Sequence, residues 1–88
     1  AAITNGATLS EGINYATGSN SCAVNMPASP DVGDRVTVKA AGLGNGKTIA
    51  INMTTGTHRV DGLTALSLGS SYGSVTMVYV NTNDWRVI

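Results

Sequence analysis

Apolar residues occupy every second position in two stretches of the chain, residues 35–40 and 48–53. Successive side chains of a strand point to opposite faces, so this period predicts two strands that each turn one face inward. The residues between them, 41–47, are rich in glycine and contain Asn45-Gly46, a pair that adopts positive φ at low cost. We therefore expect a hairpin connection between the two strands.

Shorter alternating runs indicate further strands. We expect them at residues 22–26, 57–60, 64–68, 74–80 and 85–88. The last two should pair as a hairpin across a four-residue loop, 81–84. No stretch has the apolar period of a helix, so the sequence predicts an all-β fold, a small antiparallel sandwich or barrel-like domain. Residues 1–12 have weak periodicity and two glycine breaks, which favours a leading segment ahead of a globular body at 13–88.

The strand expected at 74–80 is apolar on both faces. Its second row contains Val78 and Val80, opposite the row of Val75, Met77 and Tyr79. A strand of this kind needs a cover on each side. In so short a chain one cover can be a second sheet and the other a neighbouring subunit.

Composition narrows the classes of partner. Charged residues make up 11% of the chain, and five basic residues balance five acidic ones, against roughly 25% charged residues in ordinary domains. The basic residues are scattered, which excludes the phosphate-binding patch of a nucleic-acid protein. No run is long and apolar enough to predict membrane insertion. The chain begins with Ala1 rather than Met, so we expect a piece of a longer protein.

The single cysteine, Cys22, alternates with Val24 and Met26. No disulfide can form within the chain, and this alternation predicts a buried, inert thiol.

Residues 41–48 end in Gly46-Lys47-Thr48 and so fit a relaxed phosphate-loop pattern. That chemistry needs a helix directly after the loop, whose N-terminal amides face the phosphates. A strand is predicted there instead. The sequence therefore favours a connecting loop without nucleotide binding.

No catalytic, cofactor or metal site is expected. A catalytic Ser-His-Asp or Cys-His arrangement would have to use His58, the only histidine, and no other feature of the sequence indicates such a site. On a three-fold axis three copies of His58 could bind a metal, but the neighbours Thr57 and Arg59 lack the second histidine of a stronger pattern. We expect a surface histidine, and its position relative to such an axis stays open. The aspartates lie in expected turns, where they cap backbone amides.

The four aromatic residues divide into two pairs. Tyr79 and Trp85 flank the final hairpin, so we assign them to the core or to a subunit interface, and Trp85 joins Val78 and Val80 as an interface candidate. Tyr15 and Tyr72 lie beside glycines and serines and are candidates for exposed ligand-binding rings.

Several short segments together resemble the small C-terminal β-domains of trimeric tail fibres and tailspikes of tailed bacteriophages. The matching segments are Val24 to Ala28, Gly33 to Lys39, Ile49 to Ile51, Asp61-Gly62, Tyr72 to Val78 and Trp85 to Ile88. Two departures are Met26-Pro27, where leucine is expected before the proline, and the long Gly42 to Gly46 loop.

The resemblance implies a homotrimer at the distal tip of a fibre on the phage virion, outside the cell. Its partners would be the upstream shaft of the same chain, preceding residues 1–12, and a polysaccharide or protein of the bacterial surface. Two alternatives stay open: a monomeric carbohydrate-binding β-sandwich attached to an enzyme, and a fragment of a hydrolase.

Overall fold

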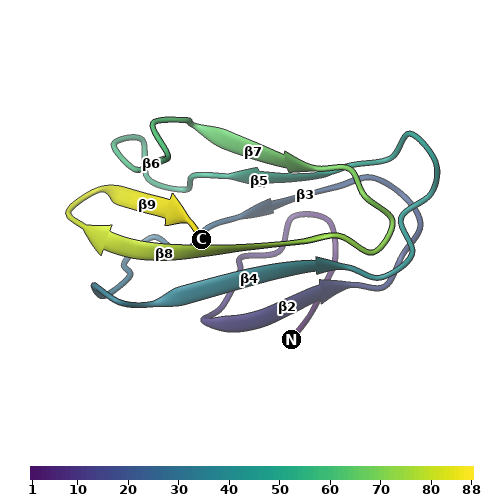
Figure 1. Cartoon of the computed structure of the whole chain (residues 1–88), viewed down its shortest axis with the longest axis horizontal. Helices are drawn as coiled ribbons and strands as arrows, with labels where there is room; N and C mark the ends of the chain where they lie inside the picture. Colours follow the sequence, from purple (N-terminus) through teal and green to yellow (C-terminus); the bar gives the residue numbers. More distant parts are fainter.

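The two sheets of this domain face each other across one apolar core (Figure 1). A computed structural model describes all 88 residues as nine strands without a helix. The strands are β1 (Ala2–Ile3), β2 (Gly12–Ala16), β3 (Cys22–Asn25), β4 (Arg35–Ala40), β5 (Ile49–Asn52), β6 (Arg59–Val60), β7 (Ala65–Leu68), β8 (Ser74–Asn81) and β9 (Asp84–Val87). The all-β prediction is confirmed. No helix exists that could cross a membrane.

The chain passes from one sheet to the other at each connection between β2 and β5. One sheet has the order β1-β2-β4-β8-β9-β6 and the other β3-β5-β7. As a result β2 lies parallel to β4, and β3 lies parallel to β5. The pairs β4–β8, β5–β7 and β8–β9 are antiparallel. Both sheets are therefore mixed, and the prediction of an antiparallel domain is wrong.

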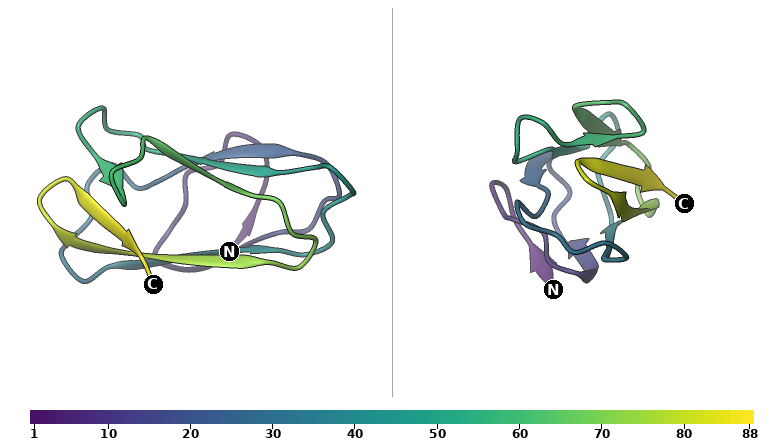
Figure 2. Two further views of the ribbon diagram at one scale, coloured as in Figure 1. Left: turned by 45° about the horizontal axis from the view of Figure 1, so that its top comes forward. Right: turned by 90° about the vertical axis from the view of Figure 1, so that its left-hand side faces the viewer.

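The prediction of a hairpin at residues 41–47 is also wrong, because the chain changes sheets there. β4 and β5 belong to different sheets, so this segment is an arch between them (Figure 2, left). Val38 of β4 and Ile51 of β5 are both fully buried and approach the core from opposite sides. The alternation of apolar and polar residues predicts which face of a strand is buried, but it does not predict which strand lies beside it.

Backbone hydrogen bonds join the two sheets along one side (Figure 2, right). On this side, residues 5–9 run along β3, where the amide of Leu9 donates to the carbonyl of Asn25 at 2.8 Å. On the other side, β6 pairs with β9, and the amide of Asp61 donates to the carbonyl of Trp85 at 2.9 Å. The fold is thus a two-sheet sandwich whose sheets are joined by backbone hydrogen bonds along one side.

Residues 1–12 are part of this body and not a leading segment. Ile3 and Leu9 are buried members of the core, and β1 pairs with β2. The boundary expected at residue 13 therefore does not exist, because the core needs these apolar side chains.

β2 was missed by the sequence pattern, because its inward positions carry Asn14 and Ala16 while Ile13 points outward. Asn14 is fully buried and donates to the carbonyls of Ser10 at 2.8 Å and Thr37 at 3.2 Å. Its side-chain oxygen accepts the amide of Ser10 at 3.1 Å. A buried amide with these partners is well satisfied and fixes the start of β2.

The final hairpin is confirmed as the pair β8–β9, but its loop is shorter than expected. The strands extend to Asn81 and Asp84, which leaves Thr82 and Asn83 at the turn. Asn83 has φ 60°, a conformation that asparagine tolerates. A shift of register between Tyr79 and Asn81 places Val80 in a bulge.

Candidate interaction surface

The side of the six-stranded sheet that points away from the core carries an apolar strip. We call it the outer face and define it by Ile13, Thr37, Thr76, Val78 and Ile88. Ile13 lies opposite Thr37, and Thr37 lies opposite Thr76. The hydroxyls of the two threonines share a hydrogen bond of 2.8 Å. The amide of Ile88 donates to the carbonyl of Thr76 at 2.9 Å and so continues the row.

The ends of this row are strongly exposed: 65% of the surface of Ile13 and 62% of that of Ile88 are accessible to water. Val78 lies in the adjacent row, between Arg35 on β4 and Arg86 on β9. The outer face thus has a hydroxyl centre, exposed isoleucines at its ends and two arginines beside it. Thr37 and Thr76 separate Ile13 from Ile88, so the apolar side chains lie at the two ends of the row.

The three interface candidates have different positions. Val78 is half-buried on the outer face, and Val80 is exposed in the bulge. Trp85 has no exposed surface, because it points between the sheets. Trp85 cannot contact a neighbouring subunit in this fold. The prediction that it belongs to the core is confirmed, and its choice as an interface candidate is wrong.

Trp85 is the centre of a small aromatic cluster. Its ring lies 5.2 Å from that of Tyr79, which lies 5.6 Å from that of His58. The Tyr79 hydroxyl accepts the amide of Asn83 at 2.8 Å, whereas the indole nitrogen of Trp85 has no hydrogen-bond partner. The cluster joins β8, β9 and the segment before β6.

The expectation of a surface histidine is wrong, since His58 is buried against Tyr79. Its amide donates to the carbonyl of Thr55 at 3.0 Å, which fixes the turn that points the ring inward. Within one chain, no three side chains of the metal-binding types come together.

Tyr15 and Tyr72 are both exposed, as expected. Tyr15 on β2 lies opposite Lys39 on β4, and the Lys39 amine donates to the carbonyl of Tyr72. Lys39 therefore links the two tyrosines, which the sequence separates by more than half the chain.

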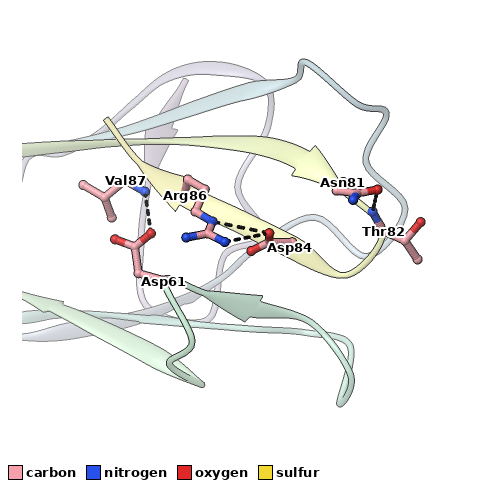
Figure 3. Close-up of polar contacts among 6 residues, drawn as sticks. All are labelled: Asp61, Asn81, Thr82, Asp84, Arg86 and Val87. Atoms are coloured by element: carbon pink, nitrogen blue, oxygen red, sulfur yellow. Dashed lines mark hydrogen bonds and ion pairs between the residues drawn. The ribbon is translucent and has the colours of Figure 1, made fainter.

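Polar contacts surround β9, which lies between β8 and β6 in the six-stranded sheet (Figure 3). Asp61, in the turn after β6, accepts the amide of Val87 at 3.3 Å. Arg86 pairs with Asp84 at 3.1 Å, and the side chain of Asn81 accepts the amide of Thr82 at 2.8 Å. The Asp61 contact ties the turn after β6 to the end of β9.

The loop that ends in Lys47 is followed by β5 and not by a helix. No helix N-terminus faces this loop, so we expect no binding of magnesium ATP or GTP. Isothermal titration calorimetry tests this. Micromolar affinity that Lys47→Ala abolishes would contradict it.

Cys22 is half-buried rather than buried, because it begins β3 at the edge of the core and lines a surface pocket. Partial burial raises the pKa of its thiol. The thiolate is the reactive form, so alkylation near neutral pH should be slower than for an exposed cysteine and should accelerate as the pH rises. Iodoacetamide kinetics with glutathione as the reference measure this, and equal rates would contradict it.

No family model matches this chain, and no curated protein matches its sequence.

Proposed function

We propose that this domain is a structural and attachment module, the C-terminal trimerisation and tip domain of a phage tail fibre or tailspike. Three chains associate through their outer faces. The observation that carries this proposal is the exposure of Ile13 and Ile88, with the half-buried Val78 in the adjacent row, on a sheet whose other side already covers the core.

The energetics favour association. Complete burial of a valine or isoleucine side chain stabilises by about 1.5–3 kcal/mol. Ile13, Val78 and Ile88 contribute from each chain, although Val78 is already half-buried and contributes less. The net charge is zero at pH 7 with neutral histidine, so net-charge repulsion between chains is absent.

Attachment to a bacterial surface is assigned to Tyr15 and Tyr72. Exposed tyrosine rings combine a large apolar area with a hydroxyl, and they lose little conformational entropy on binding. The amine of Lys39 donates to the backbone carbonyl of Tyr72, and Lys39 lies opposite Tyr15, so the backbone at Tyr72 lies near the β2–β4 pair that carries Tyr15.

Urea denaturation at several protein concentrations tests the assembly. Association stabilises the folded state by mass action, so the midpoint should rise with protein concentration. Far-UV circular dichroism follows the transition. A midpoint independent of concentration over the micromolar range would contradict the trimer and favour the monomeric carbohydrate-binding alternative.

A further inference from the structure

A small pocket opens where β1, β2 and the connection to β3 meet. Its apolar side is formed by Ile3, Ala16 and Cys22. Ile3 and Ala16 are neighbours across the parallel β1–β2 pair, and both belong to the buried core. This apolar side is therefore fixed by the sheet and by the core behind it.

The polar side of the pocket carries unused hydrogen-bonding capacity. Thr4, Thr17 and Asn20 line it and are exposed, and their side chains make no hydrogen bond within the chain. Asn5 uses its side-chain oxygen to accept the amide of Ala23 at 2.9 Å, which leaves its NH₂ group as a free donor.

Ser21, also on the polar side, accepts the amide of Thr48 at 3.0 Å and keeps its hydroxyl proton for a ligand.

The lining defines the chemistry of the ligand. No charged side chain takes part, so nothing in the pocket balances an ionic ligand. The volume is about 270 Å³, just below the roughly 300–1,000 Å³ of typical ligand sites. A small neutral ligand with one apolar face and several hydroxyls matches both sides of the pocket.

We propose that this pocket binds one monosaccharide ring. The C–H face of the sugar packs on Ile3, Ala16 and Cys22, and its hydroxyls bond to Thr17, Asn20 and their polar neighbours. No aromatic ring stacks on the sugar, since none lines the pocket, so the affinity is in the millimolar range. The pocket forms within one chain, and this inference goes beyond the proposed assembly.

The reactivity of the Cys22 thiol measures occupancy of the pocket directly, because a bound sugar covers the thiol. The methyl glycosides of glucose, galactose and N-acetylglucosamine are the probes, and the rate of alkylation by iodoacetamide is measured. At least one sugar should slow the reaction saturably, by about tenfold at ten times its Kd. Glycerol at the same concentration controls for viscosity.

Matched variants locate the effect. Thr17→Val and Asn20→Ala remove unbonded exposed groups, so they should fold normally and abolish protection. Thr57→Val removes an exposed hydroxyl outside the pocket, so in this variant the sugar should still protect Cys22 from alkylation. Saturation-transfer NMR of the same sugars should give signals that Thr17→Val removes.

No protection by any of the three sugars, or equal protection in Thr17→Val, overturns the proposal. Ile13→Asp changes the outer face and is expected to give folded monomers. The sugar should still protect Cys22 in this variant, because the pocket forms within one chain. Failure of the assembly is thereby distinguished from failure of the pocket.

Discussion

Replacing Trp85 with alanine should lower the free energy of unfolding by about 3–5 kcal/mol, the usual cost of truncating a buried aromatic residue. Trp85 is fully buried, packs on Tyr79 and holds β9 in the sheet. Small domains are commonly stable by only about 5–15 kcal/mol. The variant should therefore be largely destabilised, which urea denaturation followed by far-UV circular dichroism measures.

Tyr72→Ala is the matched control, because 69% of the Tyr72 surface is already exposed. An exposed aromatic residue leaves no cavity when it is truncated, so the free energy of unfolding should change by no more than about 0.5 kcal/mol. Equal midpoints for Trp85→Ala and the unaltered domain would show that the aromatic cluster does not hold the core.

The second large effect is expected from Ile13→Asp, which should convert the trimer to folded monomers. The carboxylate would be buried at the contact between chains, where its neighbours in the row are Thr37 and Thr76 and not a cationic side chain, and burial of such a charge costs several kcal/mol. Ile13 is a better position than Val78, where Arg35 and Arg86 on the neighbouring strands would neutralise an introduced aspartate.

The control for this variant is Leu63→Asp. Leu63 is 52% exposed and lies in the turn after β6, outside the outer face, so this change should leave the mass unaltered. Circular dichroism checks that both variants keep the fold. A trimeric Ile13→Asp protein would show that the outer face is not the contact.

The sequence was informative where one face of a strand is apolar and the other polar. β4 was predicted with its observed bounds because Val36, Val38 and Ala40 all enter the core. β2 escaped prediction because its buried position is Asn14, whose partners Ser10 and Thr37 become visible only in the fold.

The pairing of strands could not be predicted from alternation. Hairpins are the default for neighbouring strands, yet β4 and β5 are separated into two sheets. The inward positions of both strands are apolar in either arrangement, so the pattern does not distinguish a hairpin from an arch.

The candidate surface was predicted in part. The two-sided apolar pattern around Val78 indicated a second apolar face, but Ile13 and Ile88 join it only through the rows of β2, β4, β8 and β9. The pocket was missed altogether. It requires the parallel β1–β2 pair to bring Ile3 beside Ala16, and nothing in their sequence spacing signals this contact.

The mass of the isolated domain in solution tests the central claim most directly. Light scattering coupled to size-exclusion chromatography at micromolar concentration should give about 27 kDa, three times the 8.9 kDa of one chain. A single monodisperse species of 8.9 kDa would contradict the trimer and, with it, the proposed role as a fibre tip.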